Sequence, residues 1–156
     1  EMGPLINEKR VATIDGLVAD AVKKGAKLMT GGRRIGNQGC FYEPTVISDV
    51  PVSAQIMNEE PFGPVAIINR FSTIDEAIAE SNRLPFGLAA YAFTRDTALA
   101  TRLGNEIQSG MTAINHLGLA LPEVPFGGVR DSGYGTEGGS EAIEAYLETR
   151  FISRKG

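Results

Sequence analysis

Apolar residues recur at helical spacing near the start of the chain. Between residues 8 and 24 they form one face, which consists of Val11, Ile14, Leu17, Val18, Ala21 and Val22. Asn7 is a suitable N-cap, because its side-chain oxygen can accept a hydrogen bond from an amide of the first turn. Gly25 supplies the C-terminal stop. The pattern therefore predicts an amphipathic helix over residues 8–24.

Strands and helices alternate between Val65 and Asn115. Apolar runs predict strands over residues 65–71, 88–94 and 111–115. A helix begins at Thr73-x-x-Glu76, which has the form of a capping box, and a further helix begins at Asp96 or Thr97. This order is typical of right-handed crossover units on a parallel sheet, so we expect an α/β fold. Ligands of such sheets collect outside the carboxyl ends of the strands, where Asn115 lies.

The other segments carry weaker patterns. Residues 26–30 and 40–47 are expected to be short strands, and Pro44 places the second at a sheet edge or a bulge. The glycine-rich residues 31–39 predict an exposed loop, and residues 116–128 form a loop that is long for a compact domain and more often functional.

The end of the chain predicts one helix and one strand. A last helix is expected from Ser140, with Ile143, Tyr146 and Leu147 facing inward. Residues 149–153 have the pattern of a strand with no remaining chain to pair with. Such a strand is either frayed or paired with another chain.

Composition narrows the functional classes. The chain has 156 residues, 42% of them hydrophobic, and a net charge of −4. This charge gives no indication of a basic surface that would bind nucleic acid. No apolar run approaches the roughly 20 residues that span a membrane. A single cysteine excludes an intrachain disulfide and fits a reducing, cytoplasmic compartment. With one Cys and one His, a zinc site of the usual ligand types is not expected. The start at Glu1, without an initiator Met, favours a fragment.

The stretch from Asn58 to Val65 is the first candidate for chemistry. Two prolines within four residues exclude a helix interior, and Gly63 permits a close backbone approach. A stiff loop would present Glu60 and Phe62 in fixed directions, where the carboxylate could accept two hydrogen bonds from a vicinal diol. The alternative is a surface turn whose acids face water while Phe62 plugs the core, and charged turns are common.

Three further motifs are weaker candidates. The stretch Gly133-Tyr134-Gly135-Thr136-Glu137-Gly138 has the letters of a dinucleotide fingerprint, but it lacks the preceding strand and the following βαβ unit, so a turn-rich linker is the better interpretation. Cys40 has no activating group beside it in sequence and is interpreted as structural. His116 could serve as a general base, but no Ser or Asp is spaced suggestively around it. Phe126, in Pro125-Phe126-Gly127-Gly128, either lines an apolar pocket or packs in the core.

Taken together, these stretches resemble the aldehyde dehydrogenase superfamily in its C-terminal third. The pieces that match in order and spacing are Met2-Gly3-Pro4-Leu5-Ile6, residues 39–46, Glu59-Glu60-Pro61-Phe62-Gly63-Pro64-Val65, Phe86-Gly87-Leu88-Ala89-Ala90, Phe93-Thr94-Arg95-Asp96, Pro125-Phe126-Gly127-Gly128 and Ser132-Gly133-Tyr134-Gly135. The match covers nearly the whole chain, and its Glu-Glu-x-Phe-Gly-Pro and Pro-Phe-Gly-Gly pieces are highly specific.

The resemblance implies oxidation of an aldehyde to a carboxylic acid with NAD or NADP, through a thiohemiacetal and a thioester on a catalytic cysteine. It implies that Glu60 binds the nicotinamide ribose hydroxyls and that Phe62 packs against that ribose. It also implies that Phe126 belongs to the substrate tunnel and that residues 116–124 form the variable wall of the tunnel. Phe151-Ile152-Ser153 would match a strand of a homo-oligomer interface.

The resemblance also shows what this chain lacks. The nucleophilic cysteine, the general-base glutamate and the dinucleotide-binding domain of the family belong upstream of Glu1, and Cys40 does not match the nucleophile. We therefore expect no catalytic residue here and no activity of the chain alone. Residues 1–148 would form part of the catalytic domain, and residues 149–156 an oligomerisation strand and tail. The alternative is a free-standing α/β binding or assembly module without chemistry.

The likeness is strongest to the succinate-semialdehyde dehydrogenase branch. Members of that branch tend to place a serine for the substrate carboxylate at the position of Ala120. Ala120 offers no such donor, and Leu117, Leu119 and Leu121 make the wall apolar. This departure favours a less polar aldehyde. Thr136 also stands where many relatives carry Arg.

Overall fold

The computed structural model describes residues 2–156. Its first regular element is the sixteen-residue helix α1 (Glu8–Lys23). The Asn7 side chain accepts a hydrogen bond from the Arg10 amide at 2.9 Å, as the N-cap prediction requires. The helix buries the predicted face, namely Val11, Ile14, Leu17, Val18 and Ala21. Val22, the sixth residue of that predicted face, is exposed.

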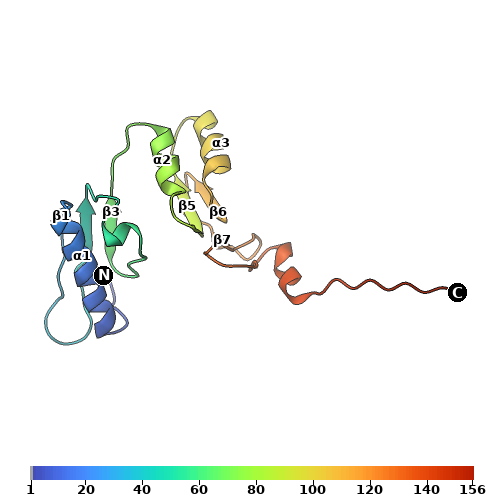
Figure 1. Cartoon of the computed structure of the whole chain (residues 1–156), viewed down its shortest axis with the longest axis horizontal. Coiled ribbons are helices and arrows are strands. Elements are labelled where there is room, and N and C mark those ends of the chain that lie inside the picture. The colour runs from blue at the N-terminus through green and yellow to red at the C-terminus, as the bar shows by residue number, and fades with distance from the viewer. Residues whose placement is uncertain (1) are drawn as a thin grey trace. The chain divides into compact units, whose positions relative to one another are not determined.

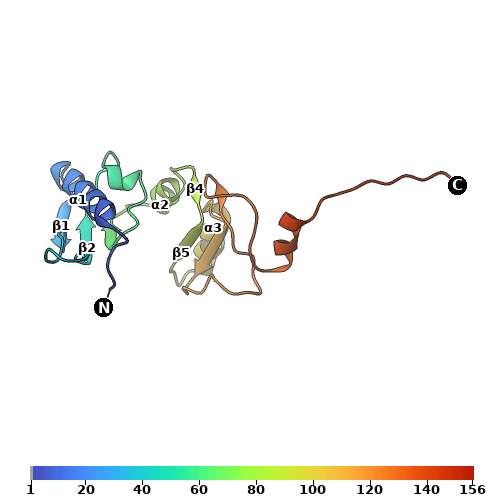
Figure 2. The ribbon, with the colours of Figure 1, turned by 90° about the horizontal axis from the view of Figure 1, so that it is seen from below.

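A three-stranded sheet lies beside α1 (Figures 1 and 2). Its strands are β1 (Lys27–Thr30), β2 (Thr45–Ser48) and β3 (Val65–Ile68), with β1 antiparallel and β3 parallel to the central β2. Ile47 pairs with Ile67 and both point to the face that α1 covers. The short helix η1 (Gln55–Met57) adds the buried Ile56 to the same core. Burial of these side chains is the main stabilising term of the first part.

The glycine-rich loop of residues 31–39 is tied to the first turn of α1. Arg34 donates through Nη1 and Nη2 to the two carboxylate oxygens of Glu8, at 2.8 and 2.6 Å. It also donates to the Gly39 carbonyl at 2.7 Å. A bidentate pair of this kind fixes direction as well as distance, so the loop is exposed but held.

The second part contains the predicted crossover unit. Strands β5 (Ala89–Ala92) and β6 (Met111–Ile114) are parallel, and helix α3 (Thr97–Glu106) connects them. The Asp96 side chain caps α3, and Thr73 and Glu76 form the predicted capping box of α2 (Ile74–Ser81). Two short strands, β4 (Phe86–Gly87) and β7 (Val129–Arg130), form a separate antiparallel pair that the pattern did not reveal.

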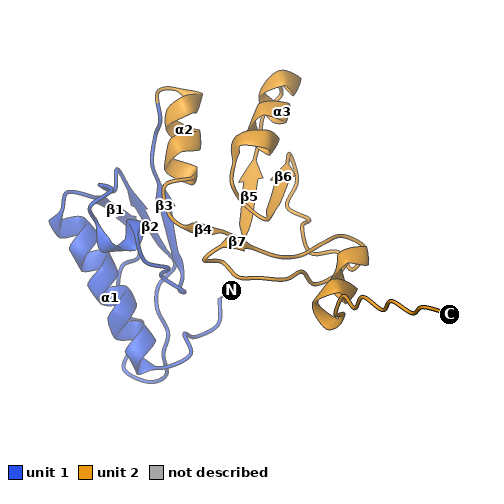
Figure 3. Ribbon diagram, turned by 45° about the vertical axis from the view of Figure 1, so that its right-hand side comes forward, with its two compact units in different colours: residues 1–71 blue, residues 72–156 orange. Residues whose placement is uncertain are grey.

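The chain divides into two compact units, residues 1–71 and 72–156 (Figure 3). We refer to them as unit 1 and unit 2. The α/β architecture expected from the sequence is confirmed, with helices and sheets in both units. The pairing differs in one respect, because β3 pairs with β2 and not with a strand of unit 2. The boundary predicted at residues 148 and 149 concerns function and stays a prediction.

The prediction for the last helix is wrong in its packing. Residues 140–146 form a 3-10 helix, η2 (Ser140–Tyr146), and Ile143, Tyr146 and Leu147 are 57%, 84% and 64% exposed instead of inward. A 3-10 helix has about three residues per turn, so it cannot hold the predicted α-helical face. Residues 149–153 are exposed and form no strand in this single chain (Figure 1), so their pairing with another chain stays a prediction.

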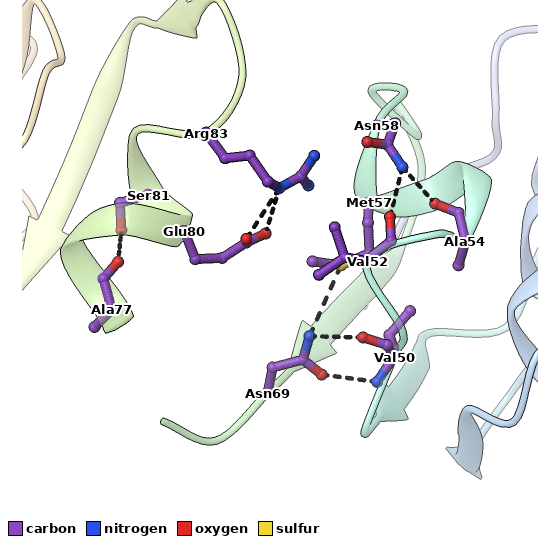
Figure 4. A network of polar contacts seen from close by, with 10 residues as sticks. All are labelled: Val50, Val52, Ala54, Met57, Asn58, Asn69, Ala77, Glu80, Ser81 and Arg83. Carbon is purple, nitrogen blue, oxygen red and sulfur yellow. Dashed lines mark hydrogen bonds and ion pairs between the residues drawn. The ribbon is translucent and has the colours of Figure 1, made fainter. Parts of the chain in front are cut away.

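Two asparagines end the parallel strand pairs. After β3, Asn69 accepts from the Val50 amide at 2.8 Å and donates to the Val50 carbonyl at 3.0 Å (Figure 4). After β6, Asn115 accepts from the Thr94 amide at 2.8 Å and donates to the Thr94 carbonyl at 2.9 Å. Each side chain forms hydrogen bonds with both the amide and the carbonyl of a residue that lies just beyond the end of the paired strands. Backbone groups that are shielded from water need such partners. We call each arrangement an asparagine clamp.

Candidate functional site

The loop of residues 58–64 is fixed at its start by η1. The amides of Asn58 and Glu59 donate to the Gln55 carbonyl at 2.8 and 2.9 Å. The Asn58 side chain donates to the carbonyls of Val52 and Ala54, at 2.8 and 2.9 Å (Figure 4). These bonds tie the first residue of the loop to the turn before it, so the chain leaves η1 in one direction.

The far end of the loop is fixed by the sheet and by α1. The Pro64 carbonyl accepts from the Thr45 amide at 2.8 Å, where the β2–β3 ladder begins. Gly63 lies so close to α1 that a Cβ at this position would come within 2.6 Å of Ile14 Cδ1. Because Ile14 is fully buried, a larger residue at position 63 would have to displace part of the core. The loop is therefore held at both ends, as its two prolines predict.

Phe62 has an unusual conformation at the centre of this loop. Its φ is +46°, in the left-handed region that bulky residues rarely adopt, and its side chain is 70% exposed. Such a conformation costs roughly 1–2 kcal/mol and tends to be found at functional sites. The alternative in which Phe62 plugs the core is wrong, because the ring is presented outward.

Glu60 carries a carboxylate that is free to accept hydrogen bonds. The side chain is exposed, and within residues 2–156 no hydrogen bond or ion pair reaches its oxygens. A carboxylate has about four lone-pair directions on two oxygens, so it can accept from two adjacent hydroxyls at once. The residue fits the predicted binding of a ribose diol without breaking an existing contact.

Helix α1 contributes one residue to this site that the sequence did not single out. The Arg10 guanidinium carbon lies 6.0 Å from the centroid of the Phe62 ring. Arg10 Nη1 also donates to the Pro61 carbonyl at 3.4 Å. Arg10 and Phe62 are separated by 52 positions in the sequence, so no local motif could have indicated their contact.

The predicted substrate residues lie in unit 2, between β6 and β7. Ala120 is exposed, as are Leu117 and Leu121 in the same loop. Phe126 is half-buried and is anchored through its backbone, because its amide and carbonyl exchange hydrogen bonds with Glu137 at 2.6 and 2.8 Å. The structure thus places an exposed apolar loop beside a fixed aromatic residue.

The glycine-rich residues 133–138 support this loop. A Cβ on Gly138, whose φ is +65°, would lie 2.6 Å from the Val124 carbonyl oxygen. The amide of Gly139 donates to the Pro122 carbonyl at 3.0 Å. The glycines therefore permit close backbone contact inside the protein. This agrees with the interpretation of a turn-rich linker and not a phosphate loop.

Cys40 lies in surroundings that keep its thiol protonated. The side chain is half-buried against the cluster that contains Val11 and Tyr42, and its Sγ donates to Glu8 Oε1 at 3.7 Å. Burial, and then the Glu8 carboxylate, raise the pKa of the Cys40 thiol. A nucleophilic cysteine needs the opposite shift, so the structure supports the structural role.

His116, metal ligands and membrane helices are the remaining candidate features. His116 is exposed, and its Nδ1 accepts from the Gly118 amide at 3.2 Å. Among residues 2–156 no group of three or more His, Cys, Asp or Glu side chains is placed to hold a metal ion. Nor does any helix in that range have the length and apolar character needed to cross a bilayer.

The structure therefore brings the predicted site residues together in two pairs. Glu60 and Phe62 share one fixed loop in unit 1, and Ala120 and Phe126 share one segment in unit 2. Their roles toward a ligand stay predictions. Arg10 and Asn69 were missed, and Asn115 was noted only as the end of a strand, since their contacts join residues that are remote in sequence.

Known proteins resemble this chain over nearly its whole length. A family model described as "Aldehyde dehydrogenase family" matches residues 1–152. A glutarate-semialdehyde dehydrogenase of Pseudomonas aeruginosa is 45% identical over 99% of this chain, which covers 32% of that relative. The 4-(hydroxymethyl)benzenesulfonate dehydrogenase TsaD1 of Comamonas testosteroni is 42% identical over 97% of this chain and 32% of its own length. Among solved structures, an NADP-dependent enzyme of Escherichia coli superposes with a TM-score of 0.90 at 41% identity, over 94% of this chain and 31% of that one. The chain thus spans about a third of the length of the relatives that it matches.

Proposed function

The chain belongs to the aldehyde dehydrogenase family, and from this premise we propose that it is the C-terminal segment of an enzyme that oxidises an aldehyde to a carboxylic acid with NAD or NADP. The observation that carries the proposal is the fixed loop of residues 58–64, with a Glu60 carboxylate that has no partner among the described residues and an outward aromatic ring on Phe62. The names of similar proteins support it, since one is a glutarate-semialdehyde dehydrogenase and another is an NADP-dependent enzyme.

In the proposed enzyme, Glu60 and Phe62 hold the nicotinamide ribose. NAD or NADP supplies the hydride acceptor when bound. The two oxygens of Glu60 accept hydrogen bonds from the vicinal ribose hydroxyls, each contributing roughly 1.5–3 kcal/mol. Phe62 packs against the sugar and restricts its movement. Because η1, α1 and β2 fix the loop, little further ordering is needed when the coenzyme binds.

Cys40 is the single cysteine of the sequence, and we propose that the nucleophilic cysteine of the reaction belongs to another part of the full-length protein. The thiohemiacetal and thioester require a thiolate. The pKa of the Cys40 thiol lies above its ordinary value, because the side chain is half-buried and adjoins the Glu8 carboxylate. We therefore expect no turnover by this chain alone.

The tail of residues 149–156 is the proposed assembly element. Phe151 and Ile152 are 90% and 73% exposed in the single chain. Large apolar side chains of this kind at an unpaired terminus favour pairing with another copy, so the proposed whole protein is a homo-oligomer.

The coenzyme assignment is tested by Glu60→Gln in the full-length protein, with Glu59→Gln as the matched control. Formation of NADH or NADPH is followed at saturating aldehyde. Glu60→Gln removes one charge-assisted acceptor, so the coenzyme KM should rise about tenfold or more. Glu59 is also exposed but has no proposed role, and its variant should resemble the wild type. Equal coenzyme KM values for the two variants would contradict the assignment.

The substrate is proposed to be an aldehyde with an apolar body. The exposed Leu117 and Leu121 make the loop wall apolar, and Ala120 offers no hydrogen-bond donor for a substrate carboxylate. The names of the relatives range from a dicarboxylic semialdehyde to an aromatic sulfonate compound, which differ in their bodies but each carry an anionic group, so the proposal rests on the loop and not on these names.

Ala120→Ser tests this placement. The added hydroxyl supplies a donor, and one hydrogen bond to a charged group corresponds to a gain of roughly tenfold or more in kcat/KM for a carboxylate-bearing aldehyde. An uncharged aldehyde of similar length should show little change. Unchanged kcat/KM values across both substrates would mean that residue 120 does not face the substrate.

A further inference from the structure

The conformation of Phe62 requires support from outside its own loop. A bulky residue at φ +46° relaxes toward the extended region unless neighbouring groups hold it. The ring is 70% exposed, so core packing does not hold it. The prolines at 61 and 64 restrict their own φ angles but not that of Phe62.

Helix α1 provides that support through Arg10. The guanidinium carbon lies over the Phe62 ring at 6.0 Å from its centroid, at the outer limit of a cation–π contact. Its Nη1 donates to the Pro61 carbonyl, the group directly before the Phe62 amide, at 3.4 Å. The side chain therefore contacts both the ring and the peptide unit whose rotation sets the direction of the ring.

The base of Arg10 is itself rigid. Its amide is the donor to the N-cap Asn7, which places the residue in the first turn of a helix with five buried residues. One turn further along, Ile14 meets Gly63 at the distance that only glycine allows. The first two turns of α1 thus contact the loop at 61, 62 and 63.

We propose that Arg10 is a positioning residue of the coenzyme site, which holds Phe62 in the orientation that packs against the nicotinamide ribose. The proposal rests on the proposed function of Glu60 and Phe62. It assigns no contact between Arg10 and the reacting atoms. Loss of Arg10 should weaken coenzyme binding by releasing the ring, while the fold of α1 persists.

The test uses Arg10→Met in the full-length protein, with Lys9→Met as the matched control. Methionine keeps an unbranched, apolar stem and removes the charge and the donor. Lys9 is the exposed neighbour in the same helical turn, so its variant removes one positive charge without touching the loop. The dissociation constant of the reduced coenzyme is measured by fluorescence titration, together with kcat and the coenzyme KM.

Loss of one cation–π contact and one hydrogen bond corresponds to roughly a threefold to thirtyfold change in a binding constant. We expect an increase of that size for Arg10→Met, and less than twofold for Lys9→Met. Arg10→Lys keeps the charge over the ring and should recover part of the loss. In a Phe62→Ala background, Arg10→Met should have less than half of its effect on the logarithm of Kd, because the ring that it positions is gone.

The outcomes separate the two proposals. If Glu60→Gln and Phe62→Ala raise the coenzyme Kd but Arg10→Met equals Lys9→Met, the role of Arg10 is overturned and the proposed function stands. If Arg10→Met has its full effect in the Phe62→Ala background, Arg10 does not act through the ring and the proposal fails. If neither Glu60→Gln nor Phe62→Ala changes Kd, the coenzyme assignment fails and the role of Arg10 fails with it.

Discussion

Unit 1 and unit 2 close a parallel strand pair with the same clamp, but they cover the pair to different extents. Asn69 directly follows β3 and holds Val50, the second residue after β2. Asn115 directly follows β6 and holds Thr94, the second residue after β5. The offsets are identical, so the same backbone solution ends both pairs.

The cover over the two pairs differs. Among the described residues, unit 1 holds eleven of the fifteen buried apolar residues, six of them on α1 and η1, and Val50 itself is 4% exposed. In unit 2 the buried apolar residues are Ile78, Leu103, Met111 and Ala113. Tyr91 of the paired strand β5 points to the same face of the sheet as Met111 of β6, and its side chain is 48% exposed.

This difference in burial suits the two units to different proposed roles. Unit 1 has a core of its own and can hold a loop such as 58–64 in a strained conformation. Unit 2 presents apolar side chains outward, which is expected of surfaces that contact other protein or ligand. A chain that spans about a third of its relatives' length offers such surfaces, and the proposed substrate wall lies among them.

The largest expected effect concerns the cores. Ile47→Ala empties a site in unit 1 that is 0% exposed and should cost about 2–5 kcal/mol. Leu103→Ala in unit 2 should fall near or below the lower limit of that range, because its surroundings are thinner and can relax. Hydrogen exchange in increasing urea, resolved by peptide in the full-length protein, measures each unit separately. Equal losses of protection in the two units after Ile47→Ala would show one shared core and remove the distinction.

Parts of this comparison were accessible from the sequence, and they are the local ones. The apolar period of α1, the capping box at Thr73 and the Asp96 cap each depend on residues within four positions of one another. These interactions act within single helices, so pattern alone predicted them. The strands were placed, but their ends were not: β1 and β6 were predicted one residue too long and β3 and β5 three residues too long. The strand predicted over residues 40–47 begins five residues later and ends one residue later, as β2, because ladder ends depend on the partner strand.

The remainder depended on contacts between remote residues. The pair β4–β7 was missed because it is held by Arg130, which donates to the carbonyls of Phe86 and Gln108 at 3.1 and 3.0 Å. The left-handed φ of Phe62 was missed because only Gly63 in that loop signals such freedom. For the proposed site, the family motif pointed to Glu60 and Phe62, whereas the contact between Arg10 and Phe62 is seen only in the fold.

The clamps should give effects of intermediate size that differ between the units. Asn69→Ala leaves the amide and carbonyl of the buried Val50 without partners and should cost about 1–3 kcal/mol. Thr94 is only half-buried, so water can replace the bonds lost in Asn115→Gly, and about 1 kcal/mol or less is expected. Glycine is chosen there because Asn115 has a φ of +63°. Exchange of the amides at residues 50 and 94 reports each clamp directly. A larger cost for Asn115→Gly would reverse the proposed ranking of the two units.

The smallest expected effect is the acid sensitivity of unit 1. Asp20 accepts from the Gln55 amide at 2.8 Å and from Lys24 Nζ at 3.0 Å, and so joins α1 to η1. The Lys24 hydrogen bond, followed by that of Gln55, holds the pKa of Asp20 below its ordinary value of 3.8. A lowered carboxyl pKa stabilises the folded state above the unfolded pKa, and this contribution is lost as the pH falls through the folded pKa.

Protection of η1 amides, corrected for intrinsic exchange, should therefore decrease below pH 3.8 in the wild type and less steeply in Asp20→Asn. Lys24→Met is the control that keeps the carboxylate and raises its pKa, so the loss should move to higher pH. Since the side chain of Asp20 is 22% exposed, solvent screens the pair and the change should stay below that of either clamp variant. An identical pH profile in wild type, Asp20→Asn and Lys24→Met would show that η1 is held by its buried Ile56 alone, and that the loop of residues 58–64 begins from a hydrophobic and not an electrostatic anchor.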